Sequence, residues 1–281
     1  METISEHGCF GGMQAFYSHY SATIGLQMKF SVYRPPQATQ GPVPVLFFLA
    51  GLTATEETFM FKAGAQRLAA EYGLMLVAPD TSPRGSGIAG ADADWDFGHG
   101  AGFYLDASEA PWKTYFRMET WVVEELYTLL LSRFPVRADR IGIFGHSMGG
   151  HGALTLALRH PKQFQSVSAF APISAPSQCP WGEKAFGRYL GPDRQLWKEH
   201  DASELMSARG ALFPNGILVD QGLSDKFLAD GQLRPEIFEA ACAAIGQPLT
   251  LRRHVGYDHG YYFISTFMAD HLAFHRDRLC R

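Results

Sequence analysis

The stretch Gly145-His146-Ser147-Met148-Gly149 decides the fold, because of the sequence on either side of it. Before it, Arg140-Ile141-Gly142-Ile143-Phe144 is a short apolar run typical of a buried strand. After it, residues 150–160 are mostly small and aliphatic and are followed by a proline, which indicates a helix. A serine at such a tight turn has a strained backbone and an exposed hydroxyl beside the free N–H groups of the helix. The stretch therefore predicts that Ser147 is a nucleophile and not part of an ordinary turn.

The wider pattern of the chain indicates an α/β protein. An antiparallel pair of strands is predicted to open it, followed by buried-type strands at 45–49, 75–78, 140–144, 166–171, 216–220 and 249–255. Helical patterns occupy 58–71, 120–132 and the C-terminal segment. We expect a single domain over residues 1–281, with a mostly parallel central sheet and helices on both faces. With the serine turn, this predicts the α/β-hydrolase fold without a large separate cap domain.

Composition excludes several classes of function. The 281 residues carry a formal net charge of −4 without any block of like charge, so neither nucleic acid nor a membrane is an expected partner. Residues 1–6 lack the basic and apolar regions of a signal peptide. Four scattered cysteines without metal-type spacing predict a cytoplasmic protein with reduced thiols. No cofactor is expected. The sequence is compatible with a homodimer.

A nucleophilic serine needs a general base, and His259 is the predicted one. It lies in a loop between the last strand and the last helix, at the sheet edge where Ser147 is expected. His254 falls within the strand pattern. His271 and His275 lie four residues apart on the last helix, which resembles a metal pair, but no third ligand is apparent and a partly solvated helix face is the better interpretation.

The acid that orients the base has two candidates in the sequence. Asp220 ends a strand and Asp225 lies in the loop after it, and both satisfy the order serine, acid, histidine. Spacing favours Asp225 only modestly. Asp258 is disfavoured because sequence neighbours rarely present a carboxylate in the plane of the imidazole.

Other residues complete the predicted site. The oxyanion should be bound by the backbone N–H of Met148 and by the loop after an early strand, which is Phe48 to Thr53 by position. Trp181, His146 and Phe227 are assigned to substrate binding. The long loop over residues 81–112 contributes aromatic side chains that either line a pocket or form a local core.

At this point the chain resembles the S-formylglutathione hydrolases, the esterase D type of serine hydrolase, along nearly its whole length. The matching blocks come in order and are Cys9-Phe10-Gly11-Gly12, Gly51-Leu52-Thr53, Ala78 to Gly85, Trp95-Asp96-Phe97-Gly98, Gly100 to Tyr104, Gly145 to Leu154, Asp220-Gln221-Gly222, Gly256 to His259 and Tyr261 to Ile264.

The resemblance implies a serine thioesterase that splits S-formylglutathione into formate and glutathione in formaldehyde detoxification, with side activity on small carboxylic esters. It implies a triad of Ser147, Asp225 and His259, oxyanion N–H groups from Leu52 and Met148, and no metal. Glutathione's carboxylates would favour basic contacts, for which the candidates are Arg84, Lys113, Lys184 and Arg188.

Two departures from the family pattern and two alternatives accompany this prediction. Ala54 stands where the family often has cysteine, and Gly260 follows the histidine where serine is common. Neither change removes a triad member. The alternatives are a general short-chain carboxylesterase of the same fold and a catalytically silent α/β-hydrolase used for binding.

Overall fold

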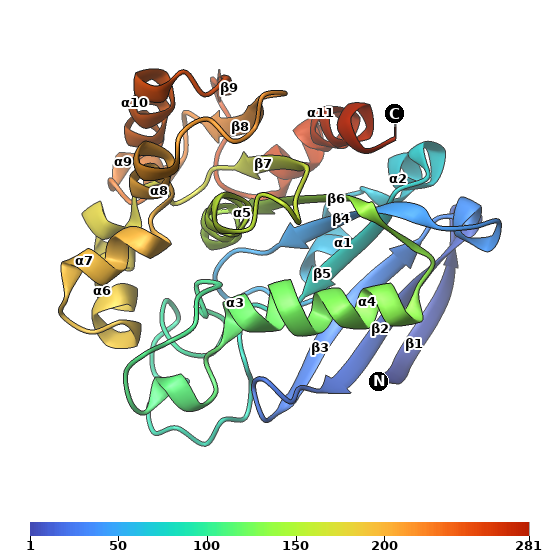
Figure 1. The fold of residues 1–281 in the computed structure, drawn as a ribbon, viewed down its shortest axis with the longest axis horizontal. Coiled ribbons are helices and arrows are strands. Elements are labelled where there is room, and N and C mark those ends of the chain that lie inside the picture. Colours follow the sequence, from blue (N-terminus) through green and yellow to red (C-terminus); the bar gives the residue numbers. More distant parts are fainter. Residues whose placement is uncertain (281) are drawn as a thin grey trace.

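The apolar runs of the sequence pair into one nine-stranded sheet, with the order β1-β2-β3-β5-β4-β6-β7-β8-β9 (Figure 1). This computed structural model describes residues 1–280. The strands are β1 (Glu2–Cys9), β2 (Gly12–Tyr20), β3 (Gln27–Arg34), β4 (Val43–Leu49), β5 (Met75–Pro79), β6 (Val136–His146), β7 (Ser166–Phe170), β8 (Ile217–Gly222) and β9 (Leu249–His254).

The sheet has an antiparallel end and a parallel body. Strands β1 to β3 pair antiparallel with one another, and β3 pairs antiparallel with β5. From β5 to β9 every neighbouring pair is parallel. The predicted opening pair is therefore three strands. Strand β1 escaped prediction because its residues are almost all exposed, so they show no alternation of apolar and polar side chains.

Helices cover both faces of the sheet. They are α1 (Thr58–Lys62), α2 (Gln66–Tyr72), α3 (Met118–Thr120), α4 (Tyr127–Arg133), α5 (Met148–Arg159), α6 (Pro180–Tyr189), α7 (Arg194–Trp197), α8 (Ala202–Arg209), α9 (Lys226–Ala229), α10 (Pro235–Ile245) and α11 (Tyr261–Leu279). Helices α4 and α5 pack on β6 from one side, and α11 packs on β6 to β8 from the other (Figure 1). The predicted α/β fold is confirmed.

Two helical predictions are corrected in detail. The stretch 58–71 is two helices, because Gly64 adopts a left-handed conformation (φ 68°) that ends α1 before α2 begins. The stretch 120–132 runs from α3 through a π-helical segment, Trp121–Leu126, into α4. Within residues 1–280, no helix has the length and apolar character needed to cross a membrane.

The order of the strands creates a crevice at one edge of the sheet. After β4 the chain moves outward to β5, and it then returns to the other side of β4 as β6. At such a switch point the loops that follow neighbouring parallel strands diverge and leave a crevice at the carboxyl edge of the sheet. A tight aromatic cluster supports the strands here, with Phe48 stacked on Phe59 and edge-on to Phe144. Ser147 follows β6 directly at this crevice.

Candidate active site

Ser147 occupies a strained turn between β6 and α5. Its backbone angles are φ 58° and ψ −120°, a conformation that costs energy for any residue with a side chain. The motif has glycines because neighbouring backbone segments approach these positions too closely for a side chain. A Cβ at Gly145 would collide with the Gly149 carbonyl, and one at Gly149 would collide with the Leu49 carbonyl. The N–H of Ser147 donates to the Phe170 carbonyl at 3.0 Å, which fixes the turn to β7.

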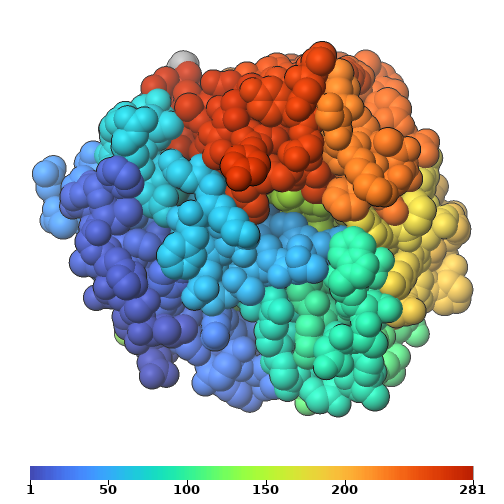
Figure 2. Space-filling view, turned by 180° about the vertical axis from the view of Figure 1, so that it is seen from behind, coloured from blue at the N-terminus to red at the C-terminus, as the bar shows by residue number. Residues whose placement is uncertain are grey.

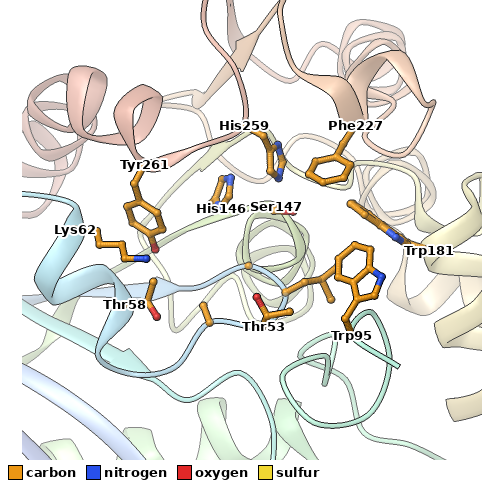
Figure 3. Close-up of a pocket in the computed structure, with 13 residues that line it drawn as sticks. Thr53, Thr58, Lys62, Trp95, His146, Ser147, Trp181, Phe227, His259 and Tyr261 are labelled. Carbon is orange, nitrogen blue, oxygen red and sulfur yellow. The ribbon is translucent and has the colours of Figure 1, made fainter. Parts of the chain in front are cut away.

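His259 and Asp225 form a close pair beside this turn. His259 Nδ1 lies 2.6 Å from Asp225 Oδ2. Because an ionised carboxylate can only accept, the shared proton belongs to Nδ1, and Nε2 is left as an acceptor. Figure 3 shows the His259 ring extending toward Ser147 in the same cleft. Sequence order had left Asp225 and Asp220 open, and Asp225 is the one that contacts His259.

The Asp225 carboxylate is held from several directions. It begins α9 as the N-cap, where Oδ1 accepts from the N–H groups of Phe227 and Leu228 at 2.8 and 3.4 Å. Oδ2 also accepts from the Gln221 side chain at 3.2 Å. The side chain is buried, so these bonds replace the water that an exposed carboxylate would have.

Asp220 is engaged elsewhere. Its two oxygens accept from Arg252 Nε and Nη2 at 2.6 and 2.5 Å, and His271 Nε2 lies 3.3 Å away. Burial opposes ionisation, yet the hydrogen bonds from His271 and Arg252 lower the pKa of Asp220 below its usual range. Asp220 is therefore a buried anion that joins β8 to β9 and α11.

The prediction of a partly solvated face at His271 and His275 is wrong. Both side chains are fully buried between α11 and the sheet. Ser168 Oγ lies 2.8 Å from a ring nitrogen of each histidine, and Ser166 Oγ lies 2.7 Å from His275 Nδ1. Burial lowers the pKa of both histidines, so they are neutral hydrogen-bonding groups. The sequence of the last helix could not reveal that these histidines are buried, because their hydrogen-bond partners are serines of β7, a distant part of the chain.

The loop after β4 lies against the serine turn. A Cβ at Gly51 would come within 3.1 Å of Ser147 Cβ and His146 Nδ1. In the described part of the chain, the backbone N–H groups of Leu52 and Met148 donate to no acceptor. These are the two groups that the family resemblance assigns to the oxyanion.

Further contacts hold this loop in place. The Ala54 carbonyl accepts from Thr81 Oγ1 at 2.6 Å and from Arg84 Nη2 at 3.1 Å. Arg84 is also bound to Asp80 through Nε and Nη2. Arg84 had been a candidate for binding substrate carboxylates, but its guanidinium is occupied in supporting the loop.

A cleft of about 340 Å³ opens above Ser147. Figure 2 shows the surface hollowed between cyan, teal, orange and red segments, which come from parts of the chain far apart in sequence. The three residues assigned to substrate binding, Trp181, His146 and Phe227, all line it. Its other lining residues are Gly51, Leu52, Thr53, Ala54, Thr58, Lys62, Trp95, Ser147, His259 and Tyr261.

One wall of the cleft is aromatic. Trp95 lies edge-on to Trp181 with 5.6 Å between ring centroids, Trp181 contacts Phe227 at 4.7 Å, and Phe227 lies edge-on to His259 at 4.8 Å. Trp95 remains 57% exposed, whereas Phe97 of the same loop is buried. The long loop 81–112 thus does both of the things considered for it: it builds a local core and contributes one side chain to the cleft.

His146 forms the floor next to His259. The two ring centroids are 4.4 Å apart, and His146 Nε2 has no hydrogen-bond partner within residues 1–280. Burial lowers the pKa of His146 well below its usual value, and a positive charge on the neighbouring His259 ring would lower it further, so the His146 ring is neutral.

Sequence reasoning missed the residues at the opposite end of the cleft, which are Thr58, Lys62 and Tyr261 (Figure 3). Lys62 and Thr58 lie on α1, far upstream of Ser147 in the sequence, and nothing in that segment signals a site. Tyr261 falls within a block that resembles the family, which was the available signal.

Known proteins similar to this chain identify its family. A family model described as "Putative esterase" matches residues 21–274. The S-formylglutathione hydrolase of Mus musculus is 52% identical over 275 residues, which cover 98% of this chain and 97% of the mouse protein. That of Paracoccus denitrificans is 52% identical over 278 residues, covering 99% and 98%. The chain belongs to the S-formylglutathione hydrolase family.

A solved structure agrees with this membership. The S-formylglutathione hydrolase of Agrobacterium tumefaciens superposes with a TM-score of 0.96 at 50% identity, covering 99% of this chain and all of that one. The family resemblance inferred from the sequence blocks is confirmed, and so is the α/β fold that it implied.

Proposed function

We propose that this protein is a serine thioesterase that hydrolyses S-formylglutathione to formate and glutathione, with side activity on small carboxylic esters. The observation that carries the chemistry is the 2.6 Å contact between His259 Nδ1 and Asp225 Oδ2, in the cleft that also holds Ser147. The choice of substrate rests on the relatives named S-formylglutathione hydrolase, which are 52% identical to this chain over nearly its whole length.

The reaction begins at Ser147. Its Oγ attacks the formyl carbon, while His259 Nε2 takes the hydroxyl proton. Asp225 keeps the histidine in the tautomer that permits this and stabilises the imidazolium that forms. The N–H groups of Leu52 and Met148 bind the negative charge on the formyl oxygen, and each such donor lowers the barrier by about 3–4 kcal/mol.

Collapse of this intermediate breaks the carbon–sulfur bond. The imidazolium of His259 gives its proton to the departing glutathione sulfur, which leaves Ser147 formylated. Water then enters, loses a proton to His259 and releases formate by the same sequence of steps. The aromatic wall of Trp95, Trp181 and Phe227 gives one side of the cleft an apolar surface.

A reducing compartment suits this substrate, and the cytoplasm is the proposed location. The four cysteines are all unpaired, and glutathione is the thiol buffer of the reducing cytosol.

The test is a comparison of three substrates: S-formylglutathione, S-acetylglutathione and 4-nitrophenyl acetate. We expect kcat/KM to be highest for S-formylglutathione and at least about tenfold lower for the acetyl thioester, since one extra methyl group on the reacting carbon changes kcat/KM by about this factor. Equal efficiency on all three would contradict the assignment and favour the general short-chain carboxylesterase.

A further inference from the structure

The end of the cleft opposite the aromatic wall gathers three polar groups from two elements. Lys62 and Thr58 come from α1, and Tyr261 is the first residue of α11. Figure 3 shows the ammonium of Lys62 and the hydroxyls of Tyr261 and Thr58 on the same side of the cleft. The Lys62 Nζ lies 5.7 Å from the centroid of the Tyr261 ring.

The side-chain donors of these three residues have no acceptor within residues 1–280. The Tyr261 hydroxyl is buried and has no partner in the described chain, a situation that costs free energy unless a ligand relieves it. Burial also raises the pKa of Tyr261, which keeps it a neutral O–H donor. Thr58 Oγ1 accepts from the Thr55 N–H at 3.0 Å, which leaves its own hydrogen available.

Lys62 differs from the other basic residues near the cleft. Lys184 pairs with Asp94 and Asp96 at 3.1 and 2.5 Å, and Arg188 pairs with Asp94 at 2.9 Å. These two residues, like Arg84, had been candidates for binding substrate carboxylates, and their charges are already neutralised. Lys113 lies outside the lining of the cleft.

Of the residues that line the cleft, Lys62 is the one lysine or arginine, and none of the ion pairs between residues 1–280 includes it. An ammonium and two hydroxyl groups, each with a hydrogen to donate and none negatively charged, suit an anion with several lone pairs, and a carboxylate has this property.

The surface continues beyond this point. A second hollow of about 440 Å³ is lined by Lys62, Tyr261, Tyr262 and Ser265, so the two depressions meet at Lys62 and Tyr261. Tyr262 is 88% exposed there. A leaving group longer than the cleft can therefore extend past Lys62 toward solvent.

We infer that Lys62, Tyr261 and Thr58 form a subsite that binds a carboxylate of the thiol leaving group, so that the enzyme selects anionic peptide thioesters over neutral ones. This inference rests on the proposed function and names the residues that recognise the leaving group. The subsite contacts a part of the substrate that lies far from the reacting carbon, so its loss should change mainly KM. Lys62 and its two neighbours are thus specificity residues, separate from the groups that carry out the chemistry.

The experiment compares S-formylglutathione with the S-formyl derivative of glutathione diethyl ester, which has the same reacting group and no carboxylates. The measured quantity is the ratio of kcat/KM for the acid to that for the diester. We expect the Lys62→Met variant to lower this ratio about tenfold through KM for the acid, because a charge-assisted hydrogen bond to a carboxylate has an effect of this order. Lys62→Arg should restore most of the ratio.

Tyr261→Phe separates recognition from folding. Removing a buried hydroxyl that has no partner should leave the melting temperature unchanged or higher, while KM for the acid rises several-fold. A matched control is Lys226→Met on α9, whose charge pairs with Asp230 outside the cleft, and it should keep the wild-type ratio.

The outcomes are distinct. If wild-type protein does not prefer S-formylglutathione over simple esters, the proposed function itself fails. If that preference holds but Lys62→Met and Lys226→Met give the same acid-to-diester ratio, the carboxylate subsite is wrong and the proposed function stands.

Discussion

Two buried aspartates five positions apart show how the direction of a side chain decides its role. Asp225 reaches His259, whereas Asp220 reaches Arg252 and His271. The order along the chain suited both, spacing favoured Asp225 only modestly, and it was the family resemblance that implied Asp225. The deciding contacts are the local backbone N–H groups that aim Asp225 as the cap of α9.

Substituting each aspartate should therefore have a different consequence. Asp225→Asn should lower kcat about 10⁴-fold with little change in stability, since the amide favours the wrong tautomer of His259. Asp220→Asn should instead lower the free energy of unfolding by about 3 kcal/mol, because Arg252 and His271 lose a buried anion. Steady-state kinetics and chemical denaturation measure the two effects, and the opposite pattern would contradict the assignment.

The places of Ser147 and His259 in the cleft were predictable, because each lies at a position that the sequence signals: a glycine-flanked turn and the loop after the last strand. Lys62 was not. Its proposed role depends on the contact of Lys62 with Tyr261, between segments about two hundred positions apart, which no local pattern encodes.

Among the elements, the buried strands were predicted best, because a continuous apolar run has few other interpretations. The helical stretch before α4 was predicted as regular, but residues 121–126 form a π-helical segment. That segment carries Glu125, whose carboxylate binds the turn between β2 and β3. It accepts from Ser21 Oγ at 2.7 Å and from the N–H groups of Ala22 and Thr23 at 3.0 and 2.9 Å.

This contact predicts a pH-dependent contribution to stability. Burial opposes the charge, but hydrogen bonds from Ser21, Thr23 and His19 lower the pKa of Glu125 to about 2. A lowered pKa stabilises the fold above the ordinary carboxyl range, and the stabilisation is lost as pH falls toward 2. Glu125→Gln should cost about 1–2 kcal/mol at pH 7, allowing for solvent screening at this partly exposed site.

The measurement is the free energy of unfolding of both proteins between pH 7 and pH 3, with urea as denaturant. The difference between wild type and Glu125→Gln should be constant above about pH 5 and shrink below it. A difference that grows in acid would have the wrong sign for this account.

On the scale of the whole molecule, four positions far apart in sequence meet at one edge of the sheet. Leu52, Ser147, Asp225 and His259 each follow a different parallel strand, β4, β6, β8 and β9. This convergence was predictable, because carboxyl ends of parallel strands share an edge. The aromatic wall was less so, since Trp95 and Trp181 come from long connections whose path depends on tertiary packing.

Ser147 is proposed to carry the acyl group, and the most direct test of this role is a covalent label. We expect an aryl fluorophosphonate to add once per chain, with peptide mapping placing the adduct on Ser147, and to abolish hydrolysis of S-formylglutathione in proportion. Ser147→Ala should take up no label and lose about 10⁶-fold in kcat. An adduct on another residue, or Ser147→Ala protein that hydrolyses S-formylglutathione at the wild-type rate, would contradict the account.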